Sequence, residues 1–327
     1  MAKFNEFVEL GAISPVGVGF ANGVVKAAEK DDKVVIILQD VGFPNIAWFQ
    51  KNAPDRIVDC GIAEANAAVV AAGLAAEGFT PIIYGFLFAT LGRAYNQIRQ
   101  SILVDRFNVK MLGREGAWSP LGISHNYVEG LAMLRVMPNM VILNPADAIE
   151  LEKAIIAMTQ YIGPVFLTLE SGFGSPPPMK IFKEDYPFDI GKAYSIKDGK
   201  DATIIATGYM ITEAIRAVEL LEKDGIDIGI INMSTIKPLD ESAVIKAAEK
   251  TGAIITAENH SIIGGLGEAV ASVLAENIPV PMVRFGVRDE FSQSGKMGPG
   301  VDELMGHFKL GAKDLALVVK ECIARKK

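Results

Sequence analysis

The chain of 327 residues has a mass of 35.0 kDa; half of its residues are hydrophobic and 22% are charged. This length fits about two domains of ~150 residues, and the composition excludes a disordered chain. The net charge is −7 and no run of five or more basic residues occurs, which disfavours a nucleic-acid-binding surface. No apolar stretch approaches the ~20 residues of a membrane span.

Cysteine and histidine are scarce. Cys60 and Cys322 lie in opposite halves of the sequence, which excludes a disulfide framework. Two cysteines and three histidines also disfavour an all-protein zinc site. The first residues show no apolar run after the early charge, so we expect no signal peptide and a cytoplasmic location.

Short apolar runs alternate with helical stretches along the first half of the chain. Val34–Leu38 is rich in β-branched residues, which predicts a strand buried on both faces. The Ala-rich stretch 64–77 contains no proline and predicts a helix that Gly78 ends. The same reasoning predicts strands at 80–84, 109–112, 141–143 and 165–169, and helices at 93–104, at 127–136 and from 146 onward.

The pattern changes at 172–198, where prolines and mixed charges predict an extended linker. The alternation then resumes, with strands predicted at 202–206, 226–231, 253–257 and 280–285, and helices at 210–223, 241–250, 265–276 and 312–324. The whole pattern predicts an α/β protein of two doubly wound domains, each a mostly parallel sheet with helices on both faces. We place the boundary near residue 185, which gives domains of residues 1–185 and 186–327.

Two glycine-rich stretches have some features of phosphate-binding loops. In 17–23 (GVGFANG) the third glycine is one residue late and no strand precedes it, so a turn entering a helix is the favoured interpretation. Gly264–Gly267 follows a strand and opens a helix, where backbone amides can hold an anion. Without a Walker lysine, tight packing is the better interpretation. His260, just before this loop, is interpreted as structural, and His307 as solvated.

Two polar residues in the first half are candidates for chemistry. Glu64 opens the predicted Ala-rich helix, which the helix dipole alone explains. Its neighbours Ile62, Ala63 and Ala67 are apolar or small, however, and desolvation raises a carboxyl pKa so that the group can share a proton. His125 lies in a loop after a strand, where the sites of α/β proteins collect, although a surface histidine is an equal interpretation.

Long motifs in both halves resemble the C-terminal half of transketolases, across nearly the whole chain. In the first half they are 59–78 (DCGIAEANAAVVAAGLAAEG), 92–99 (GRAYNQIR), 124–125 (SH), 131–135 (LAMLR), 138–140 (PNM) and 145–147 (PAD). In the second half they are 235–240 (TIKPLD) and 258–267 (ENHSIIGGLG). The resemblance implies a transketolase-like pyrimidine-binding domain followed by a transketolase C-terminal domain.

The resemblance also implies thiamine diphosphate as cofactor and a division of labour between chains. Enzymes of this kind hold magnesium and diphosphate with a Gly-Asp-Gly motif, which this sequence lacks. A split enzyme is therefore implied, in which a second polypeptide supplies the diphosphate domain and the Mg²⁺ ligands. The cofactor would lie at the junction, with two copies of each chain and no metal ligand from this one.

Individual residues of the first domain acquire roles from the resemblance. Glu64 would bond the aminopyrimidine N1′ of the cofactor and favour the imino tautomer that takes up the proton. Asp40 would lie near the pyrimidine edge, with Ile62 also in contact with the cofactor. Phe86 and Phe88 fall in the segment that stacks on the pyrimidine ring, although either could be plain core.

Substrate contacts are implied as well. His125 matches a family histidine that bonds a hydroxyl or carbonyl oxygen of the substrate and is the second catalytic candidate. The family's phosphate-binding positions carry Gly17, Pro44, Glu170 and Arg114, of which only Arg114 can hold an anion. We therefore expect a substrate that is unphosphorylated or whose anionic end is held differently.

The resulting hypothesis is a subunit that transfers a two-carbon ketol unit between a ketose donor and an aldose acceptor, active only with its partner chain. Two alternatives keep the fold: a 1-deoxy-xylulose-phosphate synthase-like condensation, or the beta subunit of a 2-oxoacid dehydrogenase. A third, from another class, is a non-catalytic paralogue that binds a partner. The presence of Glu64 argues against the third.

Overall fold

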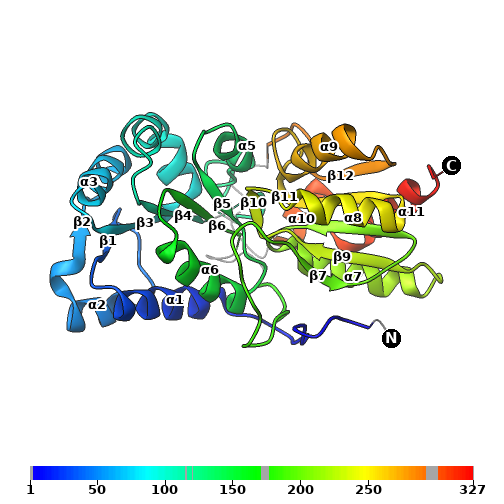
Figure 1. Cartoon of the computed structure of the whole chain (residues 1–327), viewed down its shortest axis with the longest axis horizontal. Coiled ribbons are helices and arrows are strands. Elements are labelled where there is room, and N and C mark those ends of the chain that lie inside the picture. The colour runs from blue at the N-terminus through cyan, green and yellow to red at the C-terminus, as the bar shows by residue number, and fades with distance from the viewer. Residues whose placement is uncertain (1–2, 115, 120, 171–176, 292–300, 327) are drawn as a thin grey trace.

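Two sheets lie side by side in the computed structural model, which describes residues 3–114, 116–119, 121–170, 177–291 and 301–326 (Figure 1). The first has seven strands in the order β10-β5-β6-β4-β3-β1-β2 and the second has five in the order β12-β11-β8-β9-β7. Among the described strands, β10–β5 and β7–β9 pair antiparallel and the other neighbours pair parallel. The predicted fold class, two mostly parallel sheets flanked by helices, is confirmed.

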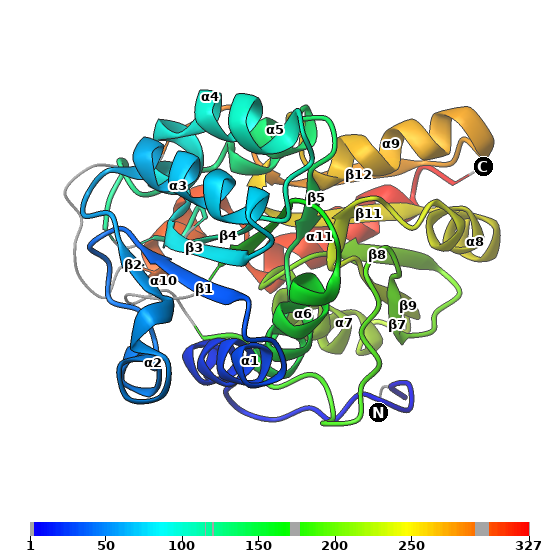
Figure 2. The ribbon, with the colours of Figure 1, turned by 60° about the vertical axis from the view of Figure 1, so that its left-hand side comes forward.

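The first sheet is covered on both faces (Figure 2). Its strands are β1 (Val34–Leu38), β2 (Ile57–Asp59), β3 (Thr80–Phe86), β4 (Lys110–Arg114), β5 (Val141–Leu143), β6 (Val165–Leu169) and β10 (Thr235–Lys237). Helices α1 (Val16–Lys30), α2 (Ile46–Asn52) and α6 (Ala148–Gln160) lie on one face. Helices α3 (Glu64–Ala76), α4 (Tyr95–Gln97) and α5 (Gly130–Arg135) lie on the other. Coverage on both faces explains why the β-branched run of β1 is buried throughout its first four residues.

The glycines of 17–23 lie inside α1 rather than in a turn before it. A Cβ on Gly19 would come within 2.1 Å of the Ala148 carbonyl oxygen, and one on Gly23 within 3.0 Å of the Glu152 carbonyl oxygen. Both contacts are with α6, so these glycines let the two helices pack at close distance. The stretch is therefore a packing feature and not a phosphate loop.

The second sheet is built in the same way. Its strands are β7 (Tyr194–Lys197), β8 (Ala202–Ala206), β9 (Ile228–Asn232), β11 (Ile254–Ser261) and β12 (Met282–Val287). Helices α7 (Met210–Glu222) and α11 (Ala312–Ile323) pack together on one side, and α8 (Glu241–Thr251) and α9 (Leu266–Asn277) on the other. The helix α10 (Val301–Phe308) precedes α11 along the chain.

The predicted linker 172–198 is wrong at its end, because β7 lies within it as an edge strand. Only Ile196 and Lys197 of the four residues are fully buried, so the strand lacks the continuous apolar run of a central parallel strand. Residues 172–176 of the predicted linker lie outside the described residues.

Three sets of contacts connect the two halves of the chain. Strand β10 comes from the second half of the sequence but extends the first sheet, with Thr235 paired to Leu143. In the opposite direction, Phe4 bridges to Lys197, beside the second sheet. A single buried cluster joins residues of the first sheet and its helices, such as Ile83, to residues of α8 and α9. The boundary near residue 185 stays a prediction, and a cut there would sever these contacts.

The predicted helix at 93–104 is helical in the structure but is not one regular α-helix. The chain forms two π-helical segments, η2 (Phe88–Arg93) and η3 (Ile98–Leu103), with the short α4 between them. The predicted helix at 127–136 begins only at Gly130, because residues 122–128 form turns with bonds such as His125 N–H to Gly122 O. Within the described ranges, we find no helix whose length and apolar character would let it cross a membrane.

Candidate active site

The carboxyl ends of β1 to β4 meet at one edge of the first sheet because these strands are parallel. Gln39 and Asp40 follow β1, and the chain after β2 leads to Glu64 at the start of α3. Phe86 ends β3 and is in register with Arg114, which ends β4. The topology therefore brings together residues that lie up to about 75 positions apart in the sequence.

Glu64 is 8% exposed and opens α3. Its Oε1 accepts a hydrogen bond of 2.9 Å from Arg93 Nη1 at the end of η2. Ala67 is fully buried, but Ile62 is 70% exposed. Ile62 therefore does not shield Glu64 from water within this chain. It could do so only if a second molecule covered it.

Three rings form a cluster at this edge. The rings of Phe86 and Phe88 are stacked, with centroids 5.7 Å apart and planes at 26°. The His125 ring meets both edge-on, at 5.0 Å from Phe86 and 4.6 Å from Phe88. All three side chains are half-buried, so neither phenylalanine is a plain core residue.

The His125 ring is held on its outer side by Ser124, whose Oγ lies 2.9 Å from Nδ1. Burial lowers the pKa of His125 below its ordinary 6.5, and the nearby positive charge of Arg93 lowers it further. The ring is therefore neutral at pH 7. A neutral imidazole offers one hydrogen-bond donor and one acceptor.

Two guanidinium groups flank the rings. Arg114 is 9% exposed and lies 5.0 Å from the centroid of Phe86 and 5.1 Å from that of Tyr84. Arg93 lies 5.4 Å from the centroid of Phe88. Sequence reasoning gave Arg93 no role, although it belongs to the GRAYNQIR motif.

Gln39 is a second residue that sequence reasoning missed. It is buried at the end of β1, and its Oε1 accepts a hydrogen bond of 2.9 Å from Thr90 Oγ1 on η2. Its Nε2 is buried without a hydrogen-bond partner among the described residues. The next residue, Asp40, is exposed and has a positive φ of 54°. No described contact joins Asp40 to the aromatic cluster.

Glu170 follows β6 and is engaged by residues from both halves of the chain. Its Oε1 accepts a hydrogen bond of 2.6 Å from Asn144 Nδ2, and its Oε2 one of 3.0 Å from the Tyr209 amide. His260 Nε2 also lies 3.1 Å from Oε1, although not aligned as a hydrogen bond. Tyr209 and His260 belong to the second half of the chain, so this carboxylate joins the two sheets. The placement of Glu170 at a phosphate-binding position of the family stays a prediction.

The glycine loop of the second sheet already binds a carboxyl group of the chain itself. The Glu258 carboxylate accepts hydrogen bonds of 2.8 Å from the amides of Leu266 and Gly267. On the other side, Arg135 donates to the carbonyl oxygens of Gly264 and Gly265, at 2.6 Å each. The internal carboxylate occupies the anion position at the start of α9, which supports the packing interpretation of this loop.

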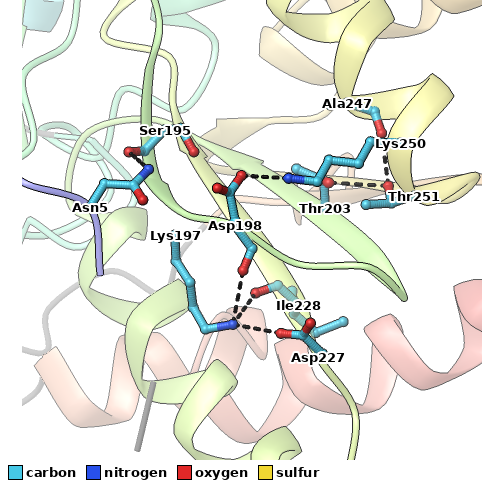
Figure 3. A network of polar contacts seen from close by, with 10 residues as sticks. All are labelled: Asn5, Ser195, Lys197, Asp198, Thr203, Asp227, Ile228, Ala247, Lys250 and Thr251. Carbon is cyan, nitrogen blue, oxygen red and sulfur yellow. Dashed lines mark hydrogen bonds and ion pairs between the residues drawn. The ribbon is translucent and has the colours of Figure 1, made fainter. Parts of the chain in front are cut away.

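A cavity of about 230 Å³ lies between β7, β9 and α8, with three lysines in its lining. Lys197 Nζ donates to Asp227 Oδ1 at 2.8 Å and to the carbonyl oxygens of Asp198 and Ile228 (Figure 3). Lys250 pairs with Asp198 at 2.6 Å. These two ammonium groups are thus neutralised within the chain, and the cavity gives no sign of a specific ligand.

Comparison with known proteins agrees with this geometry. Residues 16–172 match the transketolase pyrimidine-binding domain, and residues 191–312 match the transketolase C-terminal domain. A 6-deoxy-6-sulfo-D-fructose transketolase subunit from a Clostridium species (strain MSTE9) is 39% identical over 93% of this chain and 92% of that protein. The apulose-4-phosphate transketolase of Phocaeicola vulgatus has a subunit that is 34% identical over 94% of this chain and 96% of its own length.

A solved structure gives the same result. A split-gene transketolase, described as an inactive beta4 tetramer, superposes with a TM-score of 0.87 at 35% identity, covering 97% of this chain and 100% of that one. Both domain models and the relatives together span nearly all of the sequence. The chain therefore belongs to the transketolase family.

Proposed function

We propose that this chain is the pyrimidine-binding subunit of a split, thiamine diphosphate-dependent transketolase that moves a two-carbon ketol unit from a ketose to an aldose. The observation that supports it best is the continuous contact path from Glu64 through Arg93 and Phe88 to His125. A buried carboxylate, a stacked pair of rings and a neutral histidine meet at the carboxyl edge of a parallel sheet.

The residues at this edge fit the aminopyrimidine half of the cofactor. Thiamine diphosphate, when bound, supplies the electron sink that carbon–carbon bond cleavage needs. Glu64 would bond the ring nitrogen N1′ and hold the proton there, while Phe86 and Phe88 would pack against the ring. The buried, unpartnered Nε2 of Gln39 is a further donor beside this edge. Asp40 and Ile62 remain proposed contacts on the exposed side.

His125 is proposed to bind the substrate. Because its ring is neutral at pH 7, it can donate a hydrogen bond to a carbonyl or hydroxyl oxygen without carrying a charge into the site. Arg114 is the proposed contact for an anionic group. Its guanidinium is packed against Phe86 and Tyr84, which fixes its place at the end of β4.

A separate diphosphate-binding chain is proposed as the partner, with two copies of each chain and magnesium held by that partner. Among the described residues, no group of three or more His, Cys, Asp or Glu side chains could hold a metal ion. Ile62, just before α3, is 70% exposed, and Val69, inside α3, is 48% exposed. An exposed apolar face next to Glu64 is what an obligate subunit contact would cover.

The proposed substrate is a ketose whose far end is not held by the usual phosphate-binding set. Gly17 and Pro44 carry no charge, and Glu170 is engaged between the two sheets. The relatives named above act on a sulfonated ketose and on a phosphorylated one. The proposed enzyme either binds the anionic end of its substrate through Arg114 alone or acts on a substrate that has no anionic end.

Reconstitution tests the proposal. The chain is co-expressed with a candidate diphosphate-domain chain, and cofactor binding is followed by circular dichroism with thiamine diphosphate and Mg²⁺. We expect binding, and ketol transfer from a panel of phosphorylated, sulfonated and neutral ketoses, only when both chains are present. Cofactor binding and turnover by this chain alone would contradict the proposal, and so would ordinary affinity for xylulose 5-phosphate and ribose 5-phosphate.

A further inference from the structure

Arg93 owes its position to an unusual backbone. It is the last residue of the π-helical segment η2, five residues after Phe88. In an α-helix, residues five apart point about 140° away from each other. The i→i+5 bonding of a π-helix brings them onto the same side, and here the Arg93 guanidinium lies over the Phe88 ring. Such segments are rare and occur often at functional sites.

The guanidinium lies between a carboxylate and a ring. It donates a hydrogen bond to Glu64 Oε1 and lies over the Phe88 ring. The centroid of the His125 ring lies 4.6 Å from that of Phe88. Glu64 Oε2 accepts no hydrogen bond from the described residues, so one oxygen of the carboxylate is held and the other is open. Arg93 would therefore fix the orientation of Glu64 Oε2 toward a ligand at this edge.

Stability alone does not explain this contact. The Arg93 side chain is 56% exposed, and ion pairs with an exposed partner add little to the free energy of unfolding. A regular α-helix would satisfy the backbone equally well without a π-helical segment. The geometry is better explained by what it does to Glu64 and His125.

We propose that Arg93 is a positioning residue that orients the Glu64 carboxylate and, across Phe88, couples the charge at position 64 to His125. Its catalytic meaning rests on the function proposed above, but the coupling is a property of the single chain. The charged groups that pack on the two rings in contact with His125 are Arg93 of η2, over Phe88, and Arg114 of β4, over Phe86. Of these, Arg93 acts on the titration of His125.

Histidine NMR of the full chain tests the coupling without cofactor or partner. The chain has three histidines, His125, His260 and His307, so ring-labelled protein gives few signals to assign. Arg93→Gln should raise the pKa of His125 by about half a pH unit, the size expected for one charge near a partly hydrated ring. Arg93→Lys should leave it near the parent value, and the His307 signal should not move.

Two further variants sharpen the test. Arg99→Gln makes the same charge change at an exposed residue of η3 and should leave the pKa of His125 unchanged. Glu64→Gln leaves the Arg93 charge uncompensated and should lower the pKa of His125. An unchanged His125 in Arg93→Gln, or an equal shift in Arg99→Gln, would overturn the proposal. If Arg93→Gln fails to fold, the direction of the shift in Glu64→Gln still decides the sign of the coupling, with Arg93→Lys as the control that keeps the charge.

The reconstituted enzyme supplies the second readout. Arg93→Gln should lower kcat about tenfold and displace the pH profile, while Arg93→Lys should recover most of both. A parent enzyme that is inactive with every partner and substrate would count against the proposed function, although the NMR coupling would still stand. Coupling by NMR with an unchanged kcat and pH profile in Arg93→Gln would refute the positioning role.

Discussion

The carboxyl edges of the two sheets are built alike and used differently. Each is the edge of a mostly parallel sheet, and each gathers buried carboxylates and a histidine. At the edge of the first sheet, Glu64 keeps one open oxygen and His125 remains half-exposed. At the edge of the second, Glu258 binds two backbone amides and His260 is fully buried beside Glu170.

The difference shows what the rule about carboxyl edges can and cannot decide. Parallel strands direct polar residues to this edge in both halves of the chain. The two edges differ in what engages their carboxylates. In the second sheet both oxygens of Glu258 accept backbone amides, and the nearby Glu170 binds groups from both halves of the chain, so these carboxylates connect parts of the protein. Among the described residues, the buried side chains of Asn259 and His260 have no hydrogen-bond partner.

The largest expected effect comes from replacing Glu64 and Glu258, one at a time, with glutamine. Glu64→Gln should reduce ketol transfer by the reconstituted enzyme by roughly 10² to 10⁴, because the amide cannot exchange a proton with the cofactor ring. Glu258→Gln should lower stability instead, since an amide cannot accept from both backbone donors as well as a carboxylate does. Steady-state kinetics per folded molecule and urea unfolding separate the two. Full activity in Glu64→Gln would contradict the idea that Glu64 serves catalysis while Glu258 serves stability.

A methyl group added to the glycine loop should have the next largest effect. A Cβ on Gly265 would lie 1.9 Å from Glu258 Oε2 and 2.6 Å from the Ser261 carbonyl oxygen. Gly265→Ala should therefore lower the free energy of unfolding by about 1–3 kcal/mol. The matched control is Gly306→Ala in α10, where no neighbouring atom of the described residues lies within 4 Å of the added Cβ and a gain of about 0.5–1 kcal/mol is expected. Equal effects of the two changes would show that the loop is not tightly packed.

Most of the fold could be predicted from the sequence, because parallel buried strands are continuous apolar runs. Strands such as Val165–Leu169 and Ala202–Ala206 lie where the pattern predicts them. Elements whose stability comes from a neighbour were missed. The antiparallel strands β7 and β10 are short and lie at sheet edges, and no local pattern distinguishes the π-helical η2 and η3 from an α-helix.

The resemblance named four residues that the structure brings together, although their roles stay predictions, and it did not reveal the contacts between them. Motif resemblance pointed to Glu64, Phe86, Phe88 and His125, and the structure places them in one connected group. The sequence gives no indication that Arg93 reaches Glu64, because that contact depends on the π-helical backbone. Nor could spacing reveal that Glu170 turns toward the second sheet, since its partners lie across a contact between the two halves.

The remaining prediction is a difference in pH dependence between the two edges. Burial raises the pKa of Glu258 from its ordinary 4.5 to about 7, so between these values the folded chain holds a proton that the unfolded chain has lost. Glu258 therefore makes the free energy of unfolding fall as pH rises from 4.5 to 7, by at most about 1.4 kcal/mol per pH unit. Glu150, also raised to about 7, acts in the same direction.

His125 acts with the opposite sign, because its lowered pKa lets the unfolded chain bind the proton first as pH falls below 6.5. Urea unfolding at a series of pH values should show a shallower fall between 4.5 and 7 in Glu258→Gln and a steeper one in His125→Asn. Since His125 is only half-buried, its change should be the smaller of the two. The same slope in all three proteins would mean that neither edge carries the protonation behaviour that its burial and charges predict.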